Sequence, residues 1–203
     1  MQLTEVSTML TDYLLAAVTA ALGFALWRAA HGRSAVVISA IGFAALAVSA
    51  AAGGTYHGFA LELSASTLDA LWTTSTWTVG IFSFCIVTAA AMAYTRGPVR
   101  LALVATAAAT LLVYLAWMST HDDFRFVIYD TAFAMLLLLG LSLYGYRAGA
   151  RGAGWLLAGI AVSAAAAGVQ YAGVSLHANF NHNDLYHVVQ TAAMYLFYRG
   201  ALG

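Results

Sequence analysis

Long apolar segments alternate with short polar connections along the whole chain. Seven stretches consist mainly of Ala, Leu, Val, Ile and aromatic residues. A helix needs roughly 20 such residues to cross a bilayer, and each stretch is about that long. The pattern therefore predicts an all-α, polytopic membrane protein whose residues 1–203 form a single domain with seven transmembrane helices. The predicted helices cover residues 9–30, 35–58, 69–95, 99–119, 125–147, 153–175 and 184–201.

Composition agrees with this class and excludes several functions. The chain is 63% hydrophobic and 8% charged, whereas a soluble domain carries about 25% charged residues. It contains no lysine, which excludes a retinal Schiff base in this bundle. The single Cys85 excludes an internal disulfide, an iron–sulfur cluster and a four-cysteine zinc site. The formal net charge is zero, so no nucleic-acid partner is expected.

The charged residues predict the orientation of the bundle. Seven of the eight arginines lie at alternate connections or near the C-terminus, and arginine is typical of cytoplasmic ends. The N-terminus is therefore expected outside and the C-terminus in the cytoplasm, with the inner membrane of a bacterium as the location. No basic residue precedes the first apolar stretch, so that stretch is expected to be a retained helix and not a signal peptide. The acidic residues fall at the opposite rim: Glu5, Asp12, Glu62, Asp69, Asp122, Asp123, Asp130 and Asp184.

Histidines and a carboxylate gather at the acidic rim of the predicted bundle. His57 comes near the end of the second predicted helix, Asp69 opens the third, and His187 lies in the first turn of the seventh. Polar groups inside a membrane are costly and are usually functional. Imidazoles at one depth favour binding of a transition metal, and three imidazoles with an open fourth position form a catalytic zinc site.

The third imidazole in this prediction is His182. It lies five residues before His187, which is about 140° of rotation on a regular helix, so the two would not share a face. If Asn183 caps the helix, however, they occupy the two positions that meet in a hydrophobic staple. We therefore predict His57, His182 and His187 as metal ligands, with Asp69 holding the metal-bound water.

Each of these residues also has a simpler interpretation. His57 alone is typical of a polar tip at the membrane interface, His182 of a loop, and Asp69 of a helix N-terminus. Asp130 lies inside the fifth predicted helix. It is expected either to carry protons or to support a metal ligand, or alternatively to form an ion pair with Arg125. Only the common depth of several groups favours a metal site over these alternatives.

The placement of His57, Asp69 and His187 resembles the CREST superfamily, which includes the alkaline ceramidases and the progestin and adipoQ receptors. In that family a histidine ends helix 2, an aspartate starts helix 3 and a His-x-x-x-His pair starts helix 7. Here the first histidine of the pair falls on Asn183, one residue from His182, and a family serine falls on Gly53. The resemblance covers the whole topology.

The resemblance implies a zinc-dependent intramembrane hydrolase that cleaves a lipid amide or ester with metal-activated water. Asp69 would be the general base, and a membrane lipid would enter laterally from the bilayer. The first alternative is a non-catalytic protein that holds the same zinc as a receptor, a sensor or a structural element. A b-type haem protein with His57 and His187 as axial ligands is a further alternative. Another is an ion transporter in which Asp69, Asp130 and the histidines form the path.

Overall fold

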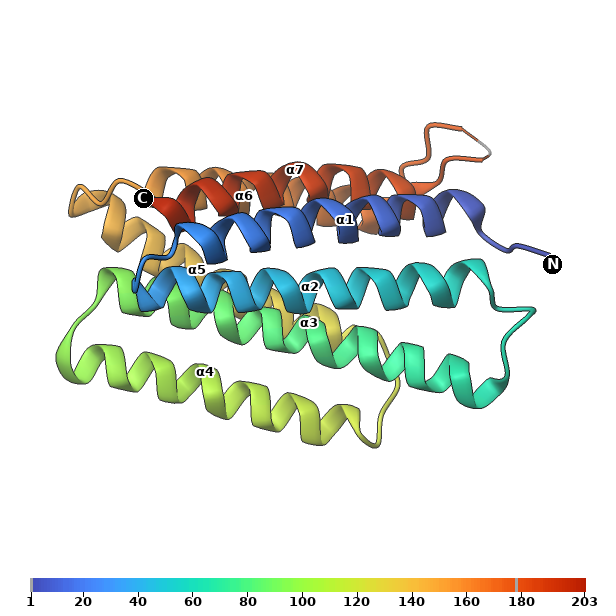
Figure 1. Cartoon of the computed structure of the whole chain (residues 1–203), viewed down its shortest axis with the longest axis horizontal. Coiled ribbons are helices and arrows are strands. Elements are labelled where there is room, and N and C mark those ends of the chain that lie inside the picture. The colour runs from blue at the N-terminus through green and yellow to red at the C-terminus, as the bar shows by residue number, and fades with distance from the viewer. Residues whose placement is uncertain (1, 178) are drawn as a thin grey trace.

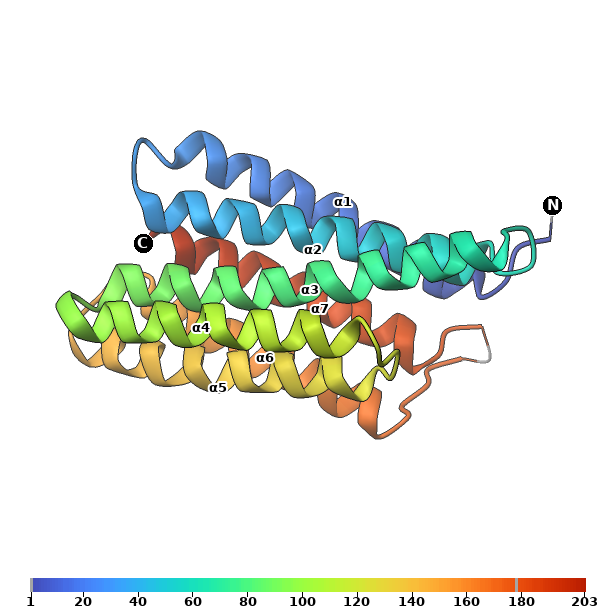
Figure 2. The same ribbon diagram turned by 90° about the horizontal axis from the view of Figure 1, so that it is seen from below.

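The chain forms a bundle of long helices that all run close to one axis (Figures 1 and 2). The structure is a computed structural model that describes residues 2–177 and 179–203. The described residues form seven helices, and the all-helical prediction is confirmed. Each helix begins and ends within four residues of its predicted bounds. The helices are α1 (Val6–Ala29), α2 (Ser34–Gly58), α3 (Ala65–Tyr94), α4 (Gly97–Met118), α5 (Arg125–Arg147), α6 (Ala153–Tyr171) and α7 (His182–Leu202).

Polarity sets α7 apart from the other helices. Within the described part of the chain, α1 to α6 are long and apolar enough to cross a membrane, as in a multi-pass membrane protein. Large apolar side chains remain exposed on their outer faces, for example Leu101, Leu112 and Leu136. Such faces suit contact with lipid tails. The first half of α7 is more polar because it carries His182, Asn183, Asp184, His187 and Gln190.

The chain alternates between two ends of the bundle. We call one end the acidic rim; it holds the start of α1 and the connections 59–64, 119–124 and 172–181. The other end, the arginine rim, holds the connections 30–33, 95–96 and 148–152 and residue 203. In Figure 1 the N-terminus lies at the acidic rim and the C-terminus at the arginine rim.

The packing order of the helices decides which side chains can meet. Helix α1 packs against α2 and against α7, although α1 and α7 are at opposite ends of the sequence. Helix α3 packs against α2, α4 and α5, and α6 packs mainly against α7. The side chains at the centre are fully buried, among them Leu26, Leu138, Met194 and Phe197.

Local sequence explains where several helices begin. Helix α3 starts before the predicted residue 69 because Ser64 caps it and accepts a hydrogen bond from the Thr67 backbone N–H at 3.3 Å. Helix α4 has Pro98 in its first turn, where the missing N–H of proline costs nothing. Helix α7 starts directly after Asn181, which caps it.

A glycine pair lets α1 approach α2 closely near the acidic rim. A Cβ atom on Gly54 would lie 2.9 Å from Asp12 Cβ and 3.1 Å from the Met9 carbonyl oxygen. A larger residue there would push the two helices apart. On Gly53 a Cβ would lie 3.6 Å from both Asp12 Oδ2 and Ser75 Oγ, so this glycine keeps a space open beside the carboxylate.

Candidate functional site

A cavity of about 190 Å³ lies near the acidic rim, where α1, α2, α3, α5 and α7 converge. We call it the acidic-rim cavity. Its ionisable lining residues come from three helices: Asp12 from α1, His57 from α2 and His187 from α7. Tyr56 and Trp72 also line it. The structure thus brings the two histidines singled out in the sequence to one cavity, and adds a carboxylate that the prediction did not include.

His187 and Asp12 face each other across the contact between α1 and α7. His187 Nε2 lies 3.3 Å from Asp12 Oδ1, and both side chains are largely buried. The other ring nitrogen, His187 Nδ1, lies at hydrogen-bond distance from Thr11 Oγ1, 3.2 Å away. The Thr11 hydroxyl also donates to the Thr8 carbonyl oxygen, so it is itself held in place. The imidazole is therefore fixed from both sides.

The start of α7 is tied to α1 by a second buried carboxylate. Asn181 and Asp184 form a capping box, in which the Asn181 backbone N–H donates to Asp184 Oδ2 at 2.7 Å. The Thr8 hydroxyl donates to the other oxygen, Asp184 Oδ1, also at 2.7 Å. A capping box satisfies backbone groups that would otherwise lack partners. Here the capping box also fixes the position of His187 along the bundle axis relative to Asp12.

The second imidazole sits at the mouth of the acidic-rim cavity. His57 Nδ1 lies 2.9 Å from Glu5 Oε2, and the His57 side chain is 30% exposed. Glu5 adopts a left-handed backbone conformation with φ of 40°, which is unusual for a residue other than glycine. The segment around it is held over the end of α2, since the Thr4 backbone N–H donates to the Gly58 carbonyl oxygen at 3.0 Å. This contact keeps the Glu5 carboxylate close to His57.

Asp69 and His182 do not reach this cavity. Asp69 is exposed near the start of α3 and is absent from the cavity lining. The capping residue of α7 is Asn181, so the staple that required a cap at Asn183 does not form. His182 is instead the first residue of a regular helix, about 140° around its axis from His187.

The predicted metal site is not assembled by these positions. Within residues 2–177 and 179–203, no three His, Cys, Asp or Glu side chains are placed so that they could hold a metal ion. Two further histidines and Asp130 also lie outside the lining of the acidic-rim cavity. His121 is exposed and stacks on Trp117, and His177 is exposed in the α6–α7 connection. Arg125 pairs with Asp123, its Nε donating to Oδ2 at 2.8 Å, and leaves Asp130 buried in α5.

A larger apolar cavity adjoins the acidic-rim cavity on the side of α5 and α6. Its volume is about 550 Å³. On the side away from the acidic-rim cavity, it is lined by Leu136 and Leu139 of α5 and by Ile160 of α6. We call it the apolar cavity. The residues that line both cavities are Leu15, Leu46, Val79, Ile128, Thr131 and Tyr186.

The residues near the start of the chain that contribute to the acidic-rim cavity were not predicted as site residues from the sequence. Asp12 and Glu5 were used only to assign the rim, and Thr11 carried no signal at all. One signal for Asp12 was present, since the carboxylate lies inside the predicted helix 9–30, where an ionisable residue is usually functional. Its partner could not be found in the same way, because only the packing of α1 on α7 brings His187 to it.

Together the groups around the acidic-rim cavity can accept, hold and return a proton. Asp12, His187 and His57 are residue types that act in general acid–base catalysis. The apolar cavity beside them offers space for a hydrocarbon chain. The arrangement therefore suits an amphiphile whose polar part lies between the imidazoles and whose chain extends between α5 and α6.

Comparison with known protein families matches residues 7–203 to a family described as "Family of unknown function (DUF6962)". The matched range contains every residue that lines the acidic-rim and apolar cavities. No curated protein and no solved structure matches the chain.

Proposed function

The chain belongs to DUF6962, a family of unknown function, and from the geometry of its cavities we propose that it is an intramembrane hydrolase of a lipid amide or ester. The observation that carries this proposal is the contact between the acidic-rim cavity and the apolar cavity. A lipid has the same division, because its cleavable bond lies between a polar headgroup and an apolar chain.

The proposal includes the placement of the protein in the membrane. All seven helices cross the bilayer, with the acidic rim outside and the arginine rim in the cytoplasm, as the distribution of arginine favours. For a bacterial chain this is the inner membrane. The lipid enters between α5 and α6, whose mutual packing is less extensive than that of α6 with α7. Its headgroup then lies at the outer rim beside His57.

Asp12 is the general base in this mechanism. The space beside Gly53 lies against the Asp12 carboxylate and Ser75 Oγ, and in this mechanism it holds the water molecule that reacts. Asp12 takes a proton from that water as the water oxygen attacks the carbonyl carbon of the lipid. The protonated Asp12 returns the proton to the leaving nitrogen or oxygen as its bond to carbon breaks. A fatty acid and an amine or alcohol result.

The two histidines have different tasks. His187, held by Thr11 on one side, keeps the Asp12 carboxylate oriented toward the cavity. His57 is held beside Glu5 at the mouth of the cavity, and it stabilises the negative charge that develops on the carbonyl oxygen. An oriented donor of this kind contributes a large share of catalysis when it is removed from bulk water.

Zinc binding remains a prediction that rests on the resemblance to the CREST superfamily. Its expected ligands His57, His182 and His187, with Asp69, do not come together in the described residues, so no step of the mechanism passes through a metal. Imidazoles and carboxylates are the donors that zinc takes in catalytic sites, and Asp12 lies beside one imidazole, that of His187. Metal analysis of the purified protein tests this prediction. Stoichiometric zinc that is lost in His187→Ala would support it.

The test of the hydrolase is turnover of membrane lipids. The purified protein is incubated with a lipid extract and with single amide and ester lipids of different chain length, and released fatty acid is measured by mass spectrometry. We expect release from at least one class of lipid. A folded protein that retains lipid but releases no fatty acid would contradict the hydrolase and support the non-catalytic alternative.

A matched pair of variants distinguishes the general base proposed from the structure, Asp12, from the one predicted from the sequence, Asp69. Asp12→Asn removes the carboxylate in the acidic-rim cavity, and Asp69→Asn makes the same change outside it. We expect Asp12→Asn to lower the rate at least about 100-fold, the usual contribution of a general base, and Asp69→Asn to change it less than about threefold. The reverse result would contradict the assignment of Asp12 and favour the residue predicted from the sequence.

A further inference from the structure

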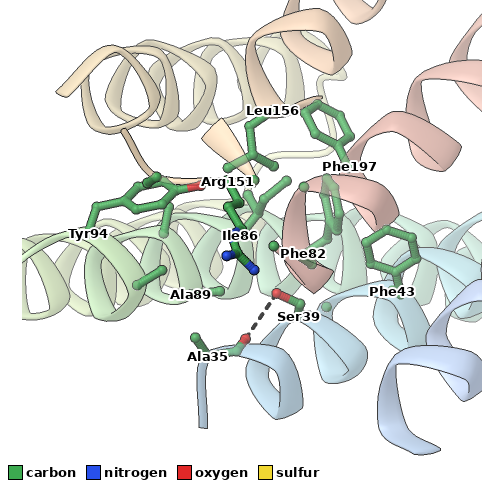
Figure 3. Close-up of a pocket in the computed structure, with 18 residues that line it drawn as sticks. Ala35, Ser39, Phe43, Phe82, Ile86, Ala89, Tyr94, Arg151, Leu156 and Phe197 are labelled. Atoms are coloured by element: carbon green, nitrogen blue, oxygen red, sulfur yellow. Dashed lines mark hydrogen bonds between the residues drawn. The ribbon is translucent and has the colours of Figure 1, made fainter. Parts of the chain in front are cut away.

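A second cavity of about 190 Å³ lies at the arginine rim, far from the catalytic groups proposed above. Figure 3 shows it enclosed by side chains from α2, α3, α6 and α7 and by the α5–α6 connection. We call it the arginine-rim cavity. Its walls are largely apolar and include Phe43, Phe82, Ile86, Leu156 and Phe197.

One charged side chain lines this cavity. Arg151, in the α5–α6 connection, extends into the space between α2 and α3 in Figure 3. Neither Asp nor Glu is present in the lining. The lining also holds two hydroxyl groups, those of Ser39 and Tyr94; the Ser39 hydroxyl already donates to the Ala35 carbonyl oxygen at 3.0 Å.

Two other arginines of this rim, Arg33 and Arg100, have partners within the protein. Arg33 donates to the Leu202 and Ala29 carbonyl oxygens, and Arg100 donates to that of Thr95. Within the part of the chain that the structure describes, the guanidinium of Arg151 has neither a hydrogen-bond acceptor nor a carboxylate as a partner. It is therefore a free cation with five N–H donors, placed against an apolar wall.

An arginine in this setting selects a particular chemistry. The planar guanidinium forms two parallel hydrogen bonds with a phosphate group, which are among the stronger hydrogen bonds in proteins. The apolar wall favours a phosphate that carries a hydrocarbon part. An engineered apolar cavity of about 150 Å³ admits benzene, so the present cavity has room for a short apolar segment and not for a whole lipid.

From this geometry we propose that the arginine-rim cavity binds a phosphate group through Arg151, with the adjoining apolar part of the same molecule against Phe82 and Phe197. The position at the rim suits a phospholipid headgroup from the surrounding leaflet. Arginine-rich rims face the cytoplasm, where the membrane surface carries anionic lipids. This site is separate from the proposed hydrolase site, and neither proposal depends on the other.

Native mass spectrometry of the protein from nanodiscs tests the proposal. The probes are phosphatidylglycerol in a background of phosphatidylcholine, and inorganic phosphate added separately. We expect Arg151→Gln to weaken retention of phosphatidylglycerol about tenfold, as for loss of a hydrogen-bonded charge. The control is Arg147→Gln, which removes the same charge from an exposed residue of the same rim that does not line the cavity. It should weaken retention less than about twofold.

A second variant tests the apolar part of the site without changing any charge. Ala93 is exposed and lines the cavity, so Ala93→Leu fills space at its mouth without disturbing the core. We expect it to weaken retention of phosphatidylglycerol several-fold. Displacement of the lipid by inorganic phosphate in wild type, and not in Arg151→Gln, would also support a phosphate site and would identify free phosphate as a ligand. Equal losses in Arg151→Gln and Arg147→Gln, or no effect of either cavity variant, would overturn the proposal.

Discussion

The acidic-rim and arginine-rim cavities have similar volumes, about 190 Å³ each, but they hold their charged groups in opposite ways. Around the acidic-rim cavity each ionisable group lies beside another from a different segment: Asp12 beside His187, and Glu5 at the mouth beside His57. In the arginine-rim cavity the charge of Arg151 lies alone against apolar walls.

This difference indicates two kinds of site. Groups that are already paired are held in fixed positions before a ligand arrives, which is what catalysis requires. A single unpaired guanidinium gains its partner only from a ligand, which is what binding of an anion requires.

The largest effect is expected from loss of the imidazole on α7. His187→Ala removes the group that orients Asp12, and we expect hydrolysis to fall about 100-fold, a loss of about 2.7 kcal/mol of transition-state stabilisation. The measurement is the rate of fatty acid release. His182→Ala, on the same helix but outside the cavity, is the matched control and should retain most of the activity. An equal loss in both would mean that the start of α7 matters only for folding.

Loss of the capping carboxylate should mainly lower stability. Asp184→Ala removes hydrogen bonds from Thr8 and from the Asn181 backbone, and we expect the free energy of unfolding to fall by about 2 kcal/mol. Thermal unfolding in detergent, followed by circular dichroism, measures this change. Asp122→Ala, at an exposed position of the same rim, should be close to neutral. A similar loss in both variants would argue against a special role of the buried cap.

Removal of the Thr11 hydroxyl should have a smaller effect on the acidic-rim cavity. Thr11→Val keeps the shape of the side chain but leaves His187 Nδ1 without its partner. We expect the rate to fall about tenfold, or about 1.4 kcal/mol, with the Michaelis constant nearly unchanged. Thr11→Ser, which keeps the hydroxyl, should recover most of the rate. If Thr11→Ser is as slow as Thr11→Val, packing and not orientation of the imidazole explains the loss.

Salt concentration should affect binding at the arginine-rim cavity more than hydrolysis at the acidic-rim cavity, and this is the smallest of the expected effects. Between about 0.1 M and about 1 M salt the Debye length falls from about 10 to about 3 Å. We expect retention of phosphatidylglycerol at the exposed Arg151 to weaken about threefold, and hydrolysis at the buried Asp12 to change less than about twofold. Both are measured on the same nanodisc preparation. Stronger salt dependence of hydrolysis would contradict the comparison.

Much of the fold followed from the sequence because it depends on local patterns. Apolar stretches of bilayer length predicted all the described helices, including both bounds of α5. The errors at helix starts have local causes, since Ser64 caps α3 and Asn181 caps α7 where later residues had been expected. These caps were visible as residue types, but several neighbouring residues could serve equally well, and only the backbone path selects one.

The candidate site was predictable only in part. His57 and His187 were identified because polar groups within a membrane are usually functional and the two lie at a common depth, and the structure places both at one cavity. Asp69 was grouped with them because it opens the third predicted helix at the same rim. Helices α2 and α3 do pack together, but Asp69 lies on an exposed face of α3, and a sequence does not reveal how a helix is rotated about its axis.

The sequence by itself therefore determined the helical bundle, the separation of acidic residues from arginines, and the two histidines of the acidic rim. Hydrophobicity and helix length act locally, so they can be read from consecutive residues. Three features needed the tertiary structure: Asp12 of α1 meets His187 of α7, an apolar cavity adjoins them, and Arg151 extends into a cavity where the described residues offer it no partner. These features depend on contacts between segments far apart in the chain, and the packing of whole helices fixes them.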